Sequence, residues 1–154
     1  MPLFIRNESR RFKIDSRKLK KKYNAILQHL AIKEKELSIL LVNDRKIKNL
    51  NQLFRNKNTS TDVLSFPQTE EKEGLDSILL GDVVVSLETA KRQAKEHGLT
   101  LEEEVVLLIT HGLLHLLGYD HEISRKEEKR MQKKTLELFQ LYFPHKDSLG
   151  NNHF

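Results

Sequence analysis

The chain of 154 residues contains no cysteine and no tryptophan, and aromatic residues make up only 6% of it. Without cysteine there is neither a disulfide framework nor a thiolate zinc site, so a bound metal must rest on histidine, aspartate or glutamate. The scarcity of aromatic side chains argues against an extended surface for stacking bases. For a nucleic-acid partner we therefore expect contacts mainly to the backbone, with strong salt dependence.

Long hydrophobic runs are also missing. The N-terminal residues 1–5 meet Arg6 before the apolar core of a signal peptide can develop. The longest apolar stretch, over residues 105–117, is interrupted by two histidines and is too short to cross a bilayer. We therefore expect a soluble, cytoplasmic protein with no membrane partner, and the length of the chain predicts a single domain over residues 1–154.

Positive charge is concentrated in two segments of the chain, whose net charge is +5. Residues 6–22 carry nine Lys or Arg against two acids, and residues 45–57 carry five with no acid. Such clusters are typical of a surface that binds a polyanion, although a solvated helix face would give the same composition. Together with the candidate metal site described below, they favour nucleic acid as the partner.

Apolar periodicity and capping residues predict an α+β fold, with a small mixed sheet of about four strands and about five helices. We expect the strand 36–42 to be covered on both faces, because its apolar run is nearly continuous. The helix that follows it should turn Ile47, Leu50, Leu53 and Phe54 inward. The expected strands are 3–6, 36–42, 63–66 and 78–86, the last two forming a hairpin, and the expected helices begin near residues 16, 44, 87, 101 and 125.

The central helix is predicted to carry a metal site near its end. It holds His111 and His115, which lie on one face because residues four apart on a helix are neighbours. Gly118 can then close the helix in a left-handed conformation and bring His121 back toward that face. Three imidazole ligands with an open fourth position are typical of a catalytic zinc ion.

The spacing of these histidines is close to the metzincin protease pattern H-E-x-x-H-x-x-G-x-x-H, which favours a zincin-like arrangement of helix and sheet. The glutamate that acts as general base in those proteases is replaced by Gly112. A peptidase would therefore lack its proton carrier. A doubly charged ion held by neutral ligands suits phosphodiester hydrolysis by a zinc-activated water.

Four segments in the same order resemble the YbeY family of bacterial metal-dependent endoribonucleases. They are the histidine run 111–121, the segment Leu50-Asn51-x-x-Phe54-Arg55, the segment 61–67 (TDVLSFP) and the segment 81–83 (GDV). The resemblance implies a zinc-dependent endonuclease specific for single-stranded RNA. It also implies a role in maturing ribosomal RNA, notably the 3′ end of the small-subunit RNA, and in ribosome quality control, with the ribosome as partner.

The resemblance further implies that His111, His115 and His121 bind one zinc ion and that Arg55 and His111 are catalytic. A guanidinium binds phosphate bidentately, which suits Arg55 as a clamp, whereas an ordinary surface ion pair is the other interpretation of this residue. Asp62, Asp82 and Asp120 are alternative candidates for orienting a histidine or accepting a proton, and each is also a common turn or cap residue. We expect Ser65 and Phe66 to belong to strand and core.

Two other functions fit parts of the sequence. The histidine spacing favours a zinc metallopeptidase, which Gly112 disfavours. A non-catalytic module that binds RNA or the ribosome, with zinc only stabilising the fold, would need a fourth protein ligand on the ion. Nickel, iron or copper can also occupy a site of three histidines, and the sequence leaves the physiological metal and the oligomeric state open.

Overall fold

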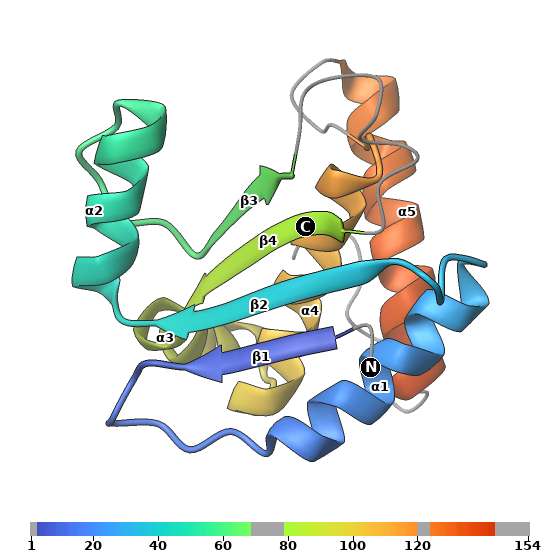
Figure 1. The fold of residues 1–154 in the computed structure, drawn as a ribbon, viewed down its shortest axis with the longest axis horizontal. Helices are drawn as coiled ribbons and strands as arrows, with labels where there is room; N and C mark the ends of the chain where they lie inside the picture. Colours follow the sequence, from blue (N-terminus) through green and yellow to red (C-terminus); the bar gives the residue numbers. More distant parts are fainter. Residues whose placement is uncertain (1–2, 69–78, 120–123, 144–154) are drawn as a thin grey trace.

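The computed structural model describes residues 3–68, 79–119 and 124–143. Within these ranges the order of elements is β1 (Leu3–Asn7), α1 (Ser16–His29), β2 (Glu36–Val42), α2 (Asp44–Arg55), β3 (Val63–Pro67), β4 (Leu79–Ser86), α3 (Leu87–His97), α4 (Leu101–Leu116) and α5 (Arg125–Tyr142) (Figure 1). One sheet runs β1-β2-β4-β3, with β1, β2 and β4 parallel and β3 antiparallel to β4. The predicted α+β fold with a mixed sheet is confirmed.

The helices begin at residues whose side chains cap them. In all five, the capping oxygen accepts a hydrogen bond from the backbone N–H three residues later, which satisfies a donor that the helix leaves unpaired. At α4 the Glu103 side chain also accepts from the N–H of Thr100, so the predicted capping box is complete. The capping residues are Asp15, Asn43, Ser86, Thr100 and Ser124.

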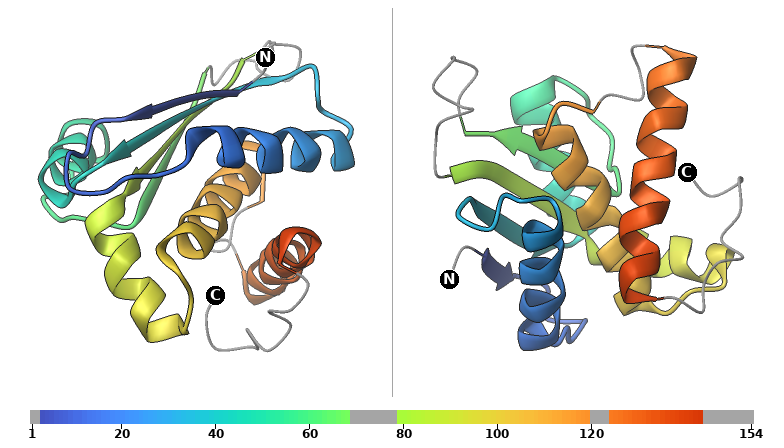
Figure 2. Two further views of the ribbon diagram at one scale, coloured as in Figure 1. Left: turned by 90° about the horizontal axis from the view of Figure 1, so that it is seen from below. Right: turned by 90° about the vertical axis from the view of Figure 1, so that its right-hand side faces the viewer.

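The main hydrophobic core lies on one face of the sheet. Figure 2 shows α1, α3, α4 and α5 on the same side of the sheet, with α4 in their midst. Eleven of the sixteen residues of α4 are buried, as its apolar sequence predicts. The hydroxyl group of Tyr23 on α1 donates to the carbonyl oxygen of Val106 over 2.5 Å and lies 3.0 Å from Oγ1 of Thr110. Two positions on α4 are thus tied to α1, the second of them next to His111.

The opposite face of the sheet is covered at one end by α2, over a second, smaller apolar cluster that includes Ile47 and Leu64. One expectation holds only in part here, and another was wrong. β2 alternates between buried and half-buried residues up to Leu41, and its second face is covered only at its end, where Leu40 and Val42 pack in this cluster. On α2, Leu53 is 74% and Phe54 64% exposed, because α2 reaches only part of the sheet and leaves its last turn outside the cluster.

In the described ranges, no helix combines the length and the apolar character that crossing a membrane requires.

Candidate active site

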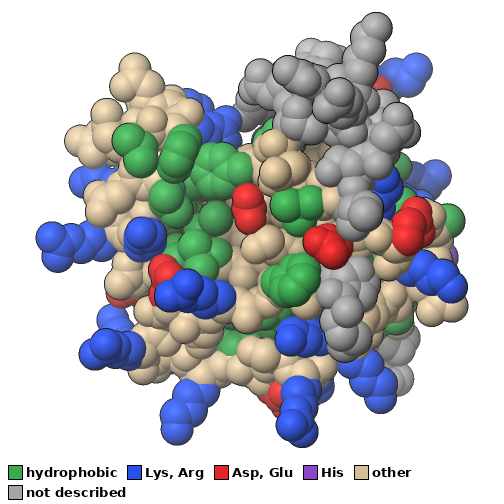
Figure 3. Space-filling view, in the orientation of Figure 1, with side chains coloured by type: hydrophobic (Ala, Val, Ile, Leu, Met, Phe, Trp, Pro, Cys, Tyr) green, Lys and Arg blue, Asp and Glu red, His purple; other side chains and the backbone are tan. Residues whose placement is uncertain are grey.

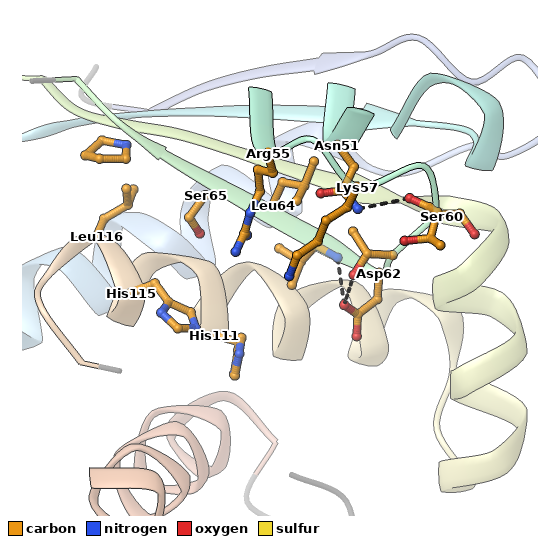
Figure 4. Close-up of a pocket in the computed structure, with 14 residues that line it drawn as sticks. Asn51, Arg55, Lys57, Ser60, Asp62, Leu64, Ser65, His111, His115 and Leu116 are labelled. Carbon is orange, nitrogen blue, oxygen red and sulfur yellow. Dashed lines mark hydrogen bonds between the residues drawn. The ribbon is translucent and has the colours of Figure 1, made fainter. Parts of the chain in front are cut away.

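A cleft of about 630 Å³ lies between β3, the loop that follows α2 and the C-terminal half of α4 (Figure 4). The segments that form it are far apart in the chain. Three of them, 50–55, 61–67 and 111–121, are among the segments that carry the family resemblance. It is lined by Asn51, Arg55, Lys57, Thr59, Ser60, Thr61, Asp62, Val63, Leu64, Ser65, Pro67, His111, His115 and Leu116.

His111 and His115 face this cleft from α4. The intervening residues 112–114 are buried, whereas both histidines are half-buried. Their ring centroids are 4.9 Å apart, with an angle of 73° between the rings. Two imidazoles at this separation on one helix face can both donate a nitrogen to one ion, so the pair fits the predicted metal site.

The third predicted ligand, His121, lies outside the described residues. Gly118 does adopt the predicted left-handed conformation, with φ of 99°. Among residues 3–68, 79–119 and 124–143, no group of three His, Cys, Asp or Glu side chains is placed to hold a metal ion. Of the predicted metal ligands, the described residues thus include only the His111–His115 pair.

Helix α4 packs very close to the sheet at the residue between these histidines. A Cβ atom at Gly112 would lie 2.7 Å from Cγ1 of Val83 on β4 and 3.0 Å from Oγ of Ser65 on β3. The Ser65 hydroxyl donates to the carbonyl oxygen of Gly112 over 3.0 Å. Because glycine has no side chain, it lets the helix backbone approach the strands and so brings His111 to the edge of β3.

A second glycine allows the same close approach further along the sheet. Gly81 on β4 has φ of 147°, and a Cβ atom there would collide with the carbonyl oxygen of Phe66. It would also lie 3.1 Å from Cδ2 of Leu116, near the end of α4. Both glycines therefore permit close packing where α4, β3 and β4 meet.

Arg55 is the last residue of α2 and points into the cleft from the side opposite the histidines (Figure 4). The chain turns away directly after it, because Asn56 adopts a left-handed conformation with φ of 56°. In the described part of the chain Arg55 forms no ion pair with a carboxylate. Among the described residues its guanidinium is thus open to bind an anion in the cleft.

The loop after α2 is held in place by a buried amide. Asn51 is 4% exposed and donates from Nδ2 to the carbonyl oxygen of Thr59 over 2.9 Å. The N–H of Lys57 donates to the carbonyl oxygen of Asn51 over 3.2 Å. These bonds fix the loop against α2 and place Lys57 beside Arg55 in the cleft.

The structure separates two of the three aspartates that the sequence leaves as alternatives. Asp62 lines the cleft, where its Oδ1 accepts from the N–H of Val63 over 2.8 Å and its Oδ2 from Gln93 over 3.2 Å. Asp82 pairs with Phe66 across the β3–β4 ladder and lines a hollow on the opposite face of the sheet. Asp120 lies outside the described residues. Of the two described carboxylates, only Asp62 lies on the side of the histidines.

The charge around the cleft suits a polyanion. Its lining contains the cations Arg55 and Lys57 and the single carboxylate Asp62. The two basic segments contribute unequally, since α1 packs next to β1, at the edge of the sheet opposite β3. Lys18 and Lys22 on α1 are both paired with Glu102, each over 3.3 Å. The second basic segment, 45–57, therefore borders the cleft and the first does not.

Three lining residues were not recognised from the sequence as part of a site. The sequence predicts Ser65 as part of strand and core, and it contains Lys57 only as one charge of a basic segment and Asn51 only as part of a family motif. Strand alternation offered one clue, because Ser65 is polar between the apolar Leu64 and Phe66 in an otherwise apolar strand. The contribution of Asn51 could not be found in this way, because it depends on the path of the following loop.

The family model described as "Endoribonuclease YbeY" matches residues 4–142. A protein of that name from Syntrophus aciditrophicus is 41% identical over 141 residues, covering 90% of this chain and 88% of the relative. One from Persephonella marina is 48% identical over 122 residues, covering 79% of this chain and 80% of the relative. A solution structure from Thermotoga maritima is 32% identical, with a TM-score of 0.61 and coverage of 97% of each chain.

Proposed function

The chain belongs to the endoribonuclease YbeY family, and we propose that it hydrolyses phosphodiester bonds of single-stranded RNA in the cleft between α4, β3 and the loop after α2. One observation carries the proposal: the cleft brings the His111–His115 pair opposite Arg55, a cation without an ion-pair partner among the described residues. As substrate we propose ribosomal RNA in the cytoplasm, notably the 3′ end of the small-subunit RNA, with a further role in ribosome quality control.

We propose a single zinc ion as cofactor, held by His111, His115 and His121 in a zincin-like arrangement of helix and sheet. The described pair supports this assignment, because it presents two imidazoles on one helix face. When bound, a zinc ion lowers the pKa of water and offsets negative charge on a phosphate oxygen. The remaining steps depend on side chains of the chain itself.

Arg55 binds the phosphate to be cleaved, or the one beside it, through two guanidinium N–H groups and stabilises the charge that builds up on its oxygens. Lys57 adds a second positive charge on the same side of the cleft. Asp62 is the described carboxylate suited to accept a proton at Oδ2, which among the described residues accepts a hydrogen bond only from Gln93. Gln93 and the Val63 N–H hold that carboxylate in position.

The proposal is tested by incubating purified protein with an unstructured, end-labelled RNA, with and without a metal chelator. We expect the protein to cut the RNA, and we expect chelation or His115→Ala to stop the cutting and reduce the zinc content. His29→Ala is the matched control, because His29 is an exposed histidine on α1 outside the cleft. Cleavage by His115→Ala at the rate of the unaltered protein would contradict the proposal. Zinc-dependent RNA binding without cleavage would favour a non-catalytic module instead.

A further inference from the structure

We propose that the outer face of β3 binds an unpaired base of the RNA, stacked against Phe54 and Phe66, next to the phosphate held by Arg55. This inference rests on the proposed function, and it assigns a base-binding subsite to the strand that crosses the cleft. Its starting point is the exposure of Phe54, which the sequence predicted to be inward.

The two rings form a stacking surface that is open to solvent. Phe54 is 64% exposed, Phe66 is half-buried, and their ring centroids are 5.4 Å apart with an angle of 64° between the rings. Phe66 packs on the small apolar cluster beneath α2, and this contact holds the pair of rings in position. An aromatic ring held in this way stacks on a nucleobase of any sequence.

The pair lies directly beside the proposed active site. Phe54 precedes Arg55, and Phe66 follows Ser65, so each ring is one residue away from a side chain that lines the cleft. Pro67 lines both the cleft and the hollow that contains the rings. Since β3 is the edge strand of the sheet, an RNA strand leaving the cleft passes over β3 onto this surface.

The hollow has a volume of about 790 Å³ and extends over the face of the sheet that the four packed helices leave open. Figure 3 shows hydrophobic side chains gathered on this face beside α2. Its polar lining includes Asp82, opposite Phe66 in the β3–β4 ladder, whose carboxylate has no hydrogen-bond partner among the described residues. A carboxylate repels phosphate and accepts hydrogen bonds from base amino groups, so a base fits here better than the RNA backbone does.

Such a subsite would also select single-stranded RNA. Stacking on a side chain requires a base that is not already paired and stacked in a helix. Two rings are enough for one base, which agrees with a chain too poor in aromatic residues for an extended platform. The backbone is then held on one side of β3 by Arg55 and Lys57, and a base on the other side by the phenylalanines.

The test uses short, unstructured RNA carrying one 2-aminopurine, whose fluorescence falls when it stacks. We expect the full-length protein to quench this fluorescence, and Phe54→Ala to weaken RNA binding by roughly 5- to 150-fold, as one lost stacking contact does. Phe54→Trp should retain binding and quenching. Leu53→Ala is the matched control, because Leu53 lies exposed on the same turn but does not line the hollow. Circular dichroism verifies the fold of each variant.

Two further probes identify what the surface recognises. An oligomer of the same length in which every residue is abasic should bind the unaltered protein and Phe54→Ala about equally. When the 2-aminopurine RNA is annealed to its complement, the unaltered protein and Phe54→Ala should bind it with equal affinity. Unchanged affinity of Phe54→Ala for the single-stranded probe would overturn the inference. The hollow would then be better explained as a surface that binds a protein partner. A protein that binds Phe54-dependently but does not cut RNA would instead contradict the proposed function alone.

Discussion

The hydroxyl group of Ser65 on β3 donates a hydrogen bond to the carbonyl oxygen of Gly112 on α4 over 3.0 Å. This bond joins the edge strand to the helix turn that carries His111, at the position where metzincin proteases hold their general base. A side chain at residue 112 would point at Val83 and Ser65 and not into the cleft. The position is therefore closed to a glutamate, which further separates this site from peptide hydrolysis.

Gly112→Ala should destabilise the protein, because the added Cβ would lie 2.7 Å from Cγ1 of Val83. Overpacking of this kind costs about 1 to 3 kcal/mol in the free energy of unfolding, measured by urea denaturation. The double variant Gly112→Ala/Val83→Ala makes room for the new methyl group. It should be destabilised by less than the sum of the single variants, and strictly additive losses would contradict the predicted collision.

Arg55→Ala should lower kcat for RNA cleavage by roughly 100-fold or more, the usual loss when a donor that stabilises transition-state charge is removed. Arg55→Lys should restore only part of the lost kcat, because an ammonium group cannot bind a phosphate bidentately. Arg17→Ala, which removes the same charge from an exposed position on α1, is the control. An equal effect of Arg17→Ala would show that overall charge, not the position of Arg55, determines the rate.

Asp62→Asn should lower kcat and change the acid limb of the pH profile of kcat, because an amide cannot accept the proton. Stability is measured in parallel, since Asp62 also accepts hydrogen bonds from Val63 and Gln93. Asp15→Asn is a suitable control, because Asp15 likewise accepts a backbone N–H but lies at the start of α1. An Asp62→Asn enzyme with an unaltered pH profile would exclude Asp62 as the proton acceptor.

The start of α2 should make stability sensitive to acid. Burial tends to raise the pKa of Asp44, but hydrogen bonds from Ser86, Thr89 and Arg92 and the charge of Arg92 hold the pKa below its ordinary value of 3.8. The folded state thus favours the ionised form, so this contribution is present above pH 3.8 and is lost as the pH falls through the lower, folded-state pKa.

The check is urea unfolding of the unaltered protein and Asp44→Asn across this pH range. Their difference in free energy of unfolding should be constant near neutral pH and shrink below pH 3.8. A difference that does not depend on pH would mean that the Asp44 charge contributes nothing, and that the variant acts through geometry alone.

Local features of the fold were predictable because they depend on local chemistry. Asn43, Ser86 and Thr100 cap helices where the sequence places a polar side chain before an apolar repeat. His111 and His115 share a face because helix geometry alone brings residues four apart together. The strand boundaries at Glu36 and Val42 agree with the prediction for the same reason, since apolar β-prone residues end there.

Features that depend on which surfaces meet were not predictable in this way. The apolar repeat of α2 predicts a buried Phe54, but burial needs a partner surface that covers the ring. In the described ranges Phe54 contacts Phe66 at its edge and is still 64% exposed. Asp62 and Asp82 look equivalent in the sequence, yet they lie on opposite faces of the sheet. Only the docking of α4 on one face, which Gly112 permits, distinguishes them.

The burial of α4 in the core indicates that folding and binding of the proposed metal ion are separate steps. Residues 105–109 drive this helix into the core, so His111 and His115 reach a common face as soon as the chain folds. If the proposed zinc ion binds there, we expect it to enter a chain that is already folded, unlike a zinc finger, whose chain stays unfolded without its ion. Chelation should then remove activity and leave the free energy of unfolding largely unchanged.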